Sequence, residues 1–579
     1  MSSFKEVQAK LDARDERPQK DAMGHLYVEE MLRNAHFKGD ISSNKDELDK
    51  FSTDESIFSV RPQIVIAPKT KRDLEIATKV IDLHTETFPP LSLTVRAAGT
   101  GLSCGSLTDS IIVDTTRYLN HIGEYNEAKD TITVEPGAMF RDVEKKLKAH
   151  GRYLPSYPAS KDMCAIGGCV GNNAAGPDSL KYGHFAEYVT AIDVVLYDGN
   201  TYTLKPLSFD AYKALIQQDN AHATIAKAVY ELVKKNEETI RKSKPQTKKN
   251  TAGYPLWDLV SPSVKLFEAG HGVFDLTRLI AGSQGTIGIM TSITLRTEPI
   301  HNDTVLLTVP IYDLEKAGEV IVNTLQYQPT NIELYDGTSL TLAMEHTNFF
   351  RDRVPGFAFY QFLLALYWTY YVSYRRKVPE FTLLITIDTT ATEHSANEIV
   401  AAVKKDTGVP ISIVNNKHFE SMFWQLRRAS YSLSKLQDNG KRPAAFLEDM
   451  IVPPEHISDF FTDIKKLLHK HNVTAAIHGH GGDGHLHFYP LLDFTKDQRS
   501  KVEAMADDFF NAACKYHGSI CGEHNDGIIR TPHLSRIYPK AILKLFETVE
   551  HACDPKDIFN PGKKVNPRYD IKLHIRNTN

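Results

Sequence analysis

Short apolar runs and amphipathic stretches alternate between residues 61 and 298. The run RPQIVIAP at 61–68 is typical of a buried strand, whereas KTKRDLEIATKVIDLHTE at 69–86 repeats its apolar residues with the period of a helix. Strands mixed with helices place this region in the α+β or α/β class. Further β-rich runs that end in turn residues lie at 91–97, 110–116, 131–137, 191–199 and 287–295.

A second region with the same rhythm begins after Pro299. Its strand-like runs alternate with amphipathic stretches, and this β–α–β order predicts a second sheet domain. The strand-like runs lie at 303–311, 330–337 and 380–389, and the amphipathic stretches at 313–326 and 395–405.

Polar stretches flank and interrupt these two regions. Residues 1–50 predict a peripheral, partly helical arm, and the Lys-rich stretch 233–249 predicts a helix end followed by an exposed loop. The N-terminus is charged throughout and lacks the apolar core of a secretory signal. The chain does not end in an address such as SKL. The expected location is therefore the cytoplasm.

Composition narrows the class of protein. The 579 residues are 41% hydrophobic and 24% charged, which is typical of a globular protein with a large core. A formal net charge of −4 gives no indication of nucleic-acid binding. The six cysteines form no CxxC pair and no ferredoxin-type run, which argues against a zinc ribbon or an iron–sulfur cluster.

Residues 356–374, GFAFYQFLLALYWTYYVSY, contain no charge and are followed by Arg375, Arg376 and Lys377. By length alone the segment could span a membrane. One span would, however, put the Gly-rich and His-rich parts of the chain on opposite sides of a bilayer. Three interpretations stay open: a buried core helix, an oligomer contact, or a helix in the membrane interface.

The loop from Arg96 to Gly105 suggests two unrelated chemistries. Gly101-Leu-Ser103-Cys-Gly105 matches the G-x-S-x-G elbow of hydrolases, but that motif needs a helix after it, and here a strand-like run follows. A dinucleotide-binding loop has the spacing G-x-G-x-x-G, which is not met. A Gly loop between strands can still hold a pyrophosphate, because backbone N–H groups approach its oxygens closely.

Other segments rich in small residues accompany this loop. Residues 155–183 have too many glycines and alanines for a packed element and suit a backbone that wraps a flat ligand. Similar small-residue segments lie at 249–254 and 282–289.

A second cluster of chemistry is HGHGGDGHLH at 478–487, followed by Glu523-His524. A Gly-rich turn between short strands brings imidazoles together, and two imidazoles with a carboxylate make a catalytic metal set that keeps an open position. The alternative is a solvent-exposed His-rich turn. The residues alone do not decide which histidines are ligands.

In this order the segments resemble the FAD-linked D-2-hydroxy-acid dehydrogenases of the vanillyl-alcohol oxidase superfamily, from about Phe51 to Pro567. The resemblance implies an α+β protein with an FAD-binding domain at 51–298, an α/β cap domain for substrate at 299–520 and a C-terminal segment at 521–579 that completes the site. The residues implied to contact FAD are Arg96, Ala98, Gly99, Thr100, Gly101, Leu102, Ser103, Pro158, Ser160, Gly167, Gly168, Asn172, Asn173, Ala174, Gly176, Gly285, Ile289 and Asn560.

The chain departs from the family pattern at several positions. Ala97 and Ala98 replace common glycines. The loop 96–105 contains no His for a covalent flavin link, although Cys104 and its neighbours leave a cysteinyl link open, and we expect non-covalent FAD. The family's H-x-G-D-G-N-L-H pattern falls on 480–487 with His485 in place of Asn, and its E-H-G pattern ends here in Asn525.

The resemblance assigns roles to the second cluster. It implies that His480, His487 and Glu523 bind a divalent metal, for which zinc suits the ligand set, with manganese or iron as alternatives. His524 is implied as the general base. Arg427 in the W-x-L-R pattern, or Arg530, is expected to bind the substrate carboxylate.

Leu447 replaces a lysine of the 2-hydroxyglutarate-specific members, which argues against a second substrate carboxylate at that contact. The expected reaction is therefore oxidation of a D-lactate-like 2-hydroxy acid to the 2-oxo acid. A quinone or another electron-transfer partner is the expected acceptor, and residues 356–374 are a candidate contact with the inner face of a membrane. The alternatives are a non-redox enzyme resembling alkylglycerone-phosphate synthases and a flavin-binding subunit without catalysis of its own.

Overall fold

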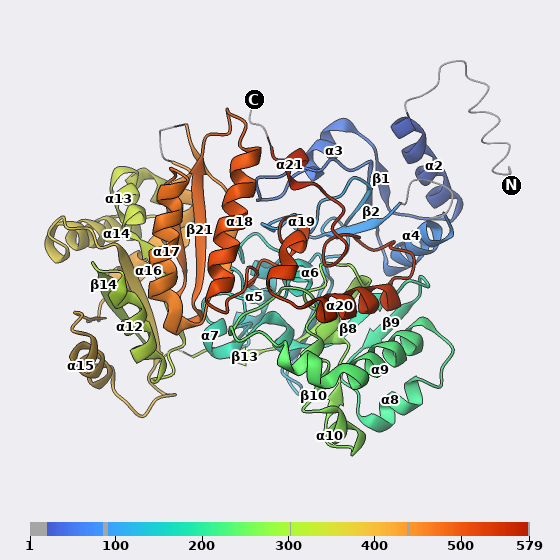
Figure 1. Ribbon diagram of the computed structural model, residues 1–579, viewed down its shortest axis with the longest axis horizontal. Coiled ribbons are helices and arrows are strands. Elements are labelled where there is room, and N and C mark those ends of the chain that lie inside the picture. Colours follow the sequence, from blue (N-terminus) through green and yellow to red (C-terminus); the bar gives the residue numbers. More distant parts are fainter. Residues whose placement is uncertain (1–19, 85–90, 302, 437–439, 577–579) are drawn as a thin grey trace.

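A computed structural model describes residues 20–84, 91–301, 303–436 and 440–576, and residues 1–19 of the expected arm lie outside this range. The described chain forms four-, five- and eight-stranded sheets and two short strand pairs. The eight-stranded sheet lies to one side of the other two, with the C-terminal segment running between them (Figure 1).

The four-stranded sheet has the order β1-β2-β4-β3. Strands β2, β4 and β3 are parallel because the amphipathic α4 crosses over between β2 and β3, and all three are short and almost completely buried. The strands are β1 (Asp40–Ser42), β2 (Ile64–Ala67), β4 (Ile111–Asp114) and β3 (Leu93–Arg96), and the helix is α4 (Lys71–His84).

The segment before residue 51 differs from the expected peripheral arm. Strand β1 pairs with β2 as the antiparallel edge of this sheet, and Val28, Leu32 and Phe37 are buried in its core. Helix α3 (Lys45–Phe51) buries Leu48 and Phe51. A few well-spaced apolar residues are enough to pack a polar segment against the sheet. The prediction of a peripheral arm relied on overall polarity and missed them.

The five-stranded sheet is antiparallel and has the order β5-β6-β12-β8-β9. The long helix α9 (Ala221–Lys242) and helix α20 (Lys540–Cys553) pack against each other in the same core. The strands are β5 (Ile122–Asn126), β6 (Thr131–Val134), β12 (Ile289–Arg296), β8 (Val189–Val195) and β9 (Thr201–Leu204).

The eight-stranded cap sheet has the order β17-β14-β16-β15-β20-β21-β18, with β19 also paired to β21. Successive residues of β14 face opposite cores: Leu306 packs with the helices of one face and Leu307 with those of the other. The strands are β14 (Thr304–Ile311), β15 (Asn331–Asp336), β16 (Phe381–Asp388), β17 (Ser412–Val414), β18 (Arg442–Pro443), β19 (Leu447–Ile451), β20 (Ala475–His480) and β21 (His485–Leu492).

Helices cover both faces of the cap sheet (Figure 1). None of the described helices is long and apolar enough to cross a membrane. One face carries α12 (Glu315–Leu325), α15 (Ala396–Thr407), α17 (Ile457–Lys470) and α18 (Arg499–Lys515), and the other α13 (Gly337–Glu345), α14 (Phe357–Trp368) and α16 (Lys417–Ser434).

The predicted small-residue loop at 155–183 contains two short helices, α6 (Ile166–Asn172) and α7 (Ser179–Tyr182). Helix α6 packs tightly, since a Cβ added to Gly167 would meet the Cβ of Pro136 at 2.6 Å. Its C-cap Asn173 adopts a left-handed conformation, with φ 51°. The glycines here serve close helix packing as well as an open loop.

Candidate active site

Four histidines project from one face at the end of the cap sheet. Cross-strand pairs of β20 and β21 set His478 opposite His487 and His480 opposite His485. Because side chains alternate along a strand, the spacings H-x-H and H-x-H place all four imidazoles on the same face. Gly484 makes the connection in a left-handed conformation, with φ 75°, where an added Cβ would meet the Val452 carbonyl oxygen at 1.9 Å.

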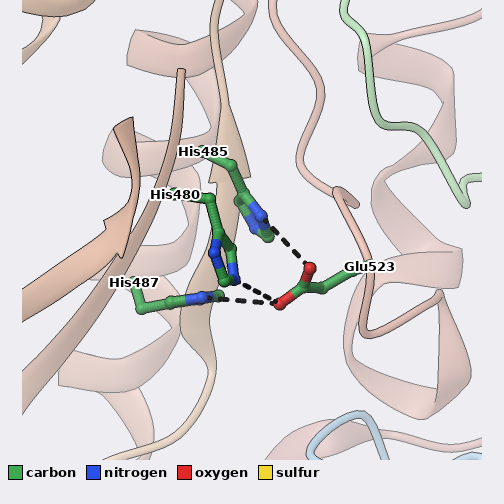
Figure 2. Close-up of side chains that lie close together, drawn as sticks. All are labelled: His480, His485, His487 and Glu523. Carbon is green, nitrogen blue, oxygen red and sulfur yellow. Dashed lines mark hydrogen bonds and ion pairs between the residues drawn. The ribbon is translucent and has the colours of Figure 1, made fainter. Parts of the chain in front are cut away.

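Glu523 approaches this face from the C-terminal segment (Figure 2). Its Oε1 lies 3.1 Å from His480 Nε2 and 3.5 Å from His487 Nε2, and its Oε2 lies 3.7 Å from His485 Nδ1. One nitrogen or oxygen from each of the four residues falls within 4.8 Å of all the others. The structure therefore brings together the three predicted ligands and adds His485, which stands where the family pattern has Asn.

The second nitrogens of His480, His485 and His487 each meet an acceptor that fixes the ring. His480 Nδ1 hydrogen-bonds Glu333 Oε1 at 2.6 Å, and His485 Nε2 hydrogen-bonds Asp449 Oδ1 at 3.0 Å. His487 Nδ1 donates to the backbone carbonyl of Glu448. Metal-binding histidines in proteins are held in this way by carboxylates or carbonyls behind them.

Lys249 lies fully buried beside Glu523. Its Nζ is 3.0 Å from Glu523 Oε2 and 3.2 Å from Asp483 Oδ2. The exposed loop predicted at 233–249 is therefore wrong at its last residue. A lysine at the end of a Lys-rich stretch looks solvated in sequence, and only the distant acids explain its burial.

Titration favours the unprotonated forms of Glu523, His485 and His487, whereas burial lowers the pKa of His480 but Glu333 raises it by more. Burial raises the pKa of Glu523, but Lys249 and the imidazoles lower it by a larger amount, so the net pKa lies well below its ordinary value. Burial lowers the pKa of His485, and it lowers that of His487 further. Neutral imidazoles and an ionised carboxylate are the forms that bind metal.

The donor set fits a divalent metal. Three imidazoles and one carboxylate suit zinc, while manganese and iron are alternatives for the same set. Within the described chain, His485 Nδ1 is buried without a hydrogen-bond partner, which leaves a donor atom directed at the cluster.

His524 lies at the edge of the cluster, with 21% of its side chain exposed. Its Nδ1 is 3.3 Å from Glu448 Oε1, and its backbone N–H donates to Asp449 Oδ2 at 2.9 Å. Burial lowers the pKa of His524, but Asp449 and Glu448 raise it by more, so the net pKa is above the ordinary value. Next to it, Asn525 replaces the family's Gly and keeps φ at 72°, a conformation that Asn tolerates.

The two predicted carboxylate-binding arginines are both buried and paired. Arg427 Nη2 lies 2.7 Å from Glu333 Oε2, and Arg530 forms an ion pair with Glu448. Both guanidinium groups keep a buried Nε that has no hydrogen-bond partner among the described residues. Glu333, Glu448 and Asp449 were not predicted as site residues; the only sequence signal was a pair of acids inside the apolar run FLEDMIVP.

The predicted flavin loops lie together on the other side of the site. A Cβ added to Gly101 would meet only the Asn172 side chain, at 4.0 Å, and one added to Gly168 would meet the Ala97 Cβ at 3.5 Å. Nothing lies within 4 Å of a Cβ added to Gly171. These small residues leave a cradle between the 96–105 loop and α6 that fits a flat dinucleotide cofactor.

Asn560 connects this cradle to the C-terminal segment. Its Nδ2 donates to the carbonyls of Gly105 and Gln284, both at 2.7 Å, and its Oδ1 accepts from Thr94 at 2.9 Å. The nearest side chain to a Cβ added at Gly285 would be Val95, at 3.7 Å. By contrast, the backbone contacts of Ser160 are local, with Met163 and Cys164.

The hydrolase interpretation of Ser103 finds no support. Its Oγ accepts a hydrogen bond from Gln284 Nε2 at 3.0 Å, and the side chain is 1% exposed. The loop leads into strand β4 and not into the helix that a nucleophile elbow requires.

Comparisons with known proteins match two separate parts of the chain. Residues 62–205 match the family "FAD binding domain", and residues 300–564 match "FAD linked oxidases, C-terminal domain". D-2-hydroxyglutarate dehydrogenase from Haemophilus influenzae is 24% identical over 93% of this chain and 51% of its own length. The Bacillus subtilis glycolate oxidase subunit GlcD is 24% identical over 87% of this chain and 89% of its own length.

The chain spans about half the length of the D-2-hydroxyglutarate dehydrogenases that it matches. Among solved structures, a 4-ethylphenol oxidase from Gulosibacter chungangensis has a TM-score of 0.65 at 11% identity, over 95% of this chain and 98% of the other. This likeness confirms the predicted vanillyl-alcohol-oxidase fold. The chain thus belongs to the FAD-linked oxidases, with an FAD-binding domain joined to the C-terminal domain of that family.

Proposed function

We propose that this protein oxidises a small D-2-hydroxy acid to the 2-oxo acid and passes the electrons to a quinone or another acceptor that is not O2. The observation that carries the proposal is the position of His524. It lies beside the buried His–Glu cluster, while the next residue, Asn525, donates hydrogen bonds to the carbonyls of Asn172 and Gly282 at the flavin cradle. A base at the junction of a metal site and a flavin site suits the removal of a hydroxyl proton.

His524 accepts the hydroxyl proton of the substrate in this proposal. Glu448 and Asp449 stabilise the imidazolium that results, because both carboxylates face its Nδ1. Arg427 donates its unpaired Nε–H to the substrate carboxylate. Arg530 acts as a positioning residue, since it is fully buried and holds Glu448. FAD, when bound in the cradle, supplies the two-electron acceptor for the Cα hydrogen.

We propose that His480, His485, His487 and Glu523 hold a divalent metal. Charge supports this. The buried cluster contains three permanent cations, Lys249, Arg427 and Arg530. They face five carboxylates, which leaves an excess of two negative charges. The carboxylates are those of Glu333, Glu448, Asp449, Asp483 and Glu523. A bound metal would act there as a Lewis acid that lowers the pKa of the substrate hydroxyl.

The same pairing favours a monocarboxylate substrate of the D-lactate type. Lys249, Arg427 and Arg530 are each already matched by an acid of this chain. Leu447 is fully buried and provides no further cation. If Arg427 binds the first carboxylate, a second carboxylate on the substrate would have to compete with Glu448 for Arg530 or with Glu523 for Lys249.

An anaerobic titration of the holoprotein tests the proposal. Purified enzyme is titrated with D-lactate, glycolate and D-2-hydroxyglutarate, with L-lactate as the stereochemical control, while the visible flavin band is recorded. We expect D-lactate to bleach the band and a chelator to abolish the bleaching. Failure of all three acids would reject the dehydrogenase and favour a non-redox flavoenzyme or a flavin-binding subunit.

A further inference from the structure

Helix α14 and the π-turn that continues it, Thr369–Ser373, expose a row of large apolar side chains. The row consists of Phe357, Tyr360, Leu364, Tyr367, Trp368 and Tyr371, which are between 42% and 74% exposed. Their spacing of three or four residues places them on one side of the helix. We call this row the α14 outer surface.

The opposite side of the same helix is a packed core. Phe359, Phe362 and Leu366 are at most 7% exposed and share an apolar cluster with Met422 and Leu426 of α16. The helix is therefore apolar on all sides, but the protein covers only one of them. A helix of this composition is normally buried on all sides. The described part of the chain does not cover the α14 outer surface, so we expect a partner outside it to do so.

Basic residues rim the α14 outer surface. Arg375, Arg376 and Lys377 follow the π-turn and are exposed, as are Arg351 and Arg353 before the helix. The Arg376 guanidinium lies 5.0 Å from the Tyr371 ring centroid, so the charge sits directly beside the aromatic row. None of Arg375, Arg376 and Lys377 forms an ion pair with an acid in the described ranges of the chain.

We propose that the α14 outer surface binds an anionic lipid membrane, with α14 lying in the plane of the interface. Aromatic side chains next to basic residues match the boundary between acyl chains and anionic headgroups. Helix α14 lies at the end of the molecule opposite α2 (Lys20–Asn34) and α9 (Figure 1).

A second copy of the chain is the less suitable occupant. In a two-fold contact the same surface meets itself, so Arg375, Arg376 and Lys377 of one copy would face either the same residues or Arg351 and Arg353 of the other, and both arrangements bring like charges together. The membrane proposal uses no residue of the catalytic cluster and does not rest on the proposed reaction. It would place a membrane-dissolved acceptor within reach of the protein.

Vesicle sedimentation of the full-length holoprotein tests the proposal. We expect binding to vesicles that contain phosphatidylglycerol and little binding to phosphatidylcholine alone. Leu364→Glu should lower the partition coefficient at least about tenfold, because it puts a charge at the centre of the apolar row. Leu573→Glu is the matched control: Leu573 is 72% exposed and Leu364 70%, and we expect the control to bind like the unchanged protein.

A triple change, Arg375→Gln with Arg376→Gln and Lys377→Gln, tests the electrostatic part. Each lost charge should weaken binding to the anionic vesicles about fivefold, with a smaller salt dependence. Flavin reduction by the hydroxy acid in solution should not change in any of these variants. Unaltered sedimentation of Leu364→Glu, or no binding of the unchanged protein to anionic vesicles, overturns the proposal. A dimer that Leu364→Glu dissociates would assign the surface to a second copy and also overturn it.

Discussion

The flavin cradle and the histidine cluster lie on two sides of one site and are built by opposite means. The cradle consists of backbone and small residues, such as Gly101, Gly168 and Gly171, around which an added Cβ finds space. The cluster consists of ionised and polar side chains that are almost completely buried. The difference follows from the ligands. A long, flat cofactor needs room and backbone N–H groups, whereas a small cation needs converging donor atoms held by a shell of further acceptors.

Removing the proposed base should slow flavin reduction without lowering the FAD content, and this is the largest effect that we expect. His524→Ala is expected to slow anaerobic flavin reduction by the hydroxy acid about 10²- to 10⁴-fold, because it removes the proposed general base. Stopped-flow absorbance at the flavin band measures this rate, and FAD content should not change. His418→Ala, at an exposed histidine of α16, is the control. Equal rates for the two variants would remove His524 from its proposed role.

Breaking the buried ion pairs of the histidine cluster should lower the free energy of unfolding, whereas breaking an exposed pair should lower it much less. Lys249→Met leaves Glu523 and Asp483 buried without their cation, and we expect a loss of about 3–5 kcal/mol in the free energy of unfolding. Urea denaturation measures it. The exposed pair of Lys242 and Glu238 provides the control, because Lys242→Met should cost less than about 1 kcal/mol. Similar losses in both variants would contradict the structural role of Lys249.

Restoring the family's residue at position 485 should weaken metal binding without touching FAD. His485→Asn is expected to lower zinc affinity at least about tenfold in a chelator competition. It should also change the visible spectrum of the cobalt(II)-loaded protein, because one nitrogen ligand is lost. His478→Asn is the matched control, since His478 shares the strand face but lies outside the four-residue set. Unchanged affinity after His485→Asn would return the site to three protein ligands.

Filling the flavin cradle should weaken FAD binding without affecting metal binding. Gly101→Val adds side-chain volume where the neighbouring side chains leave room, so the protein should fold while FAD binding weakens by about 1–3 kcal/mol. Gly101→Ala should have a smaller effect. Titration of the apoprotein with FAD, together with metal analysis, distinguishes the two sides of the site. Loss of metal in Gly101→Val would show that the two halves are not independent.

The pH dependence should show the smallest effect. A base must be neutral to accept a proton, so flavin reduction should rise with pH through the pKa of His524. Because Asp449 and Glu448 raise this pKa above the ordinary value of about 6.5, the acidic limb should lie above that pH. Glu448→Gln removes one of the two charges and should move the limb to lower pH. A limb that stays in place would mean that another group titrates.

Much of the fold could be predicted because its signals are local. The runs 61–68, 91–97 and 110–116 form β2, β3 and β4, and the amphipathic 69–86 contains α4. The predictions failed where packing decides between equally polar segments. Strand β1 and Lys249 both lie in stretches rich in charge, yet the first pairs in a sheet and the second is fully buried.

The sequence by itself determined the flavin loops, the facing histidines and the apolar helix at 356–374. Glycine content, strand alternation and helical period act over a few residues, so they can be read without a partner. Only the tertiary structure decided that His485 joins the cluster, that Arg530 is paired with Glu448, and which side of α14 is uncovered. The cause is that a buried charge must find its counter-charge wherever the chain returns. Lys249 finds it in Glu523, 274 residues further on.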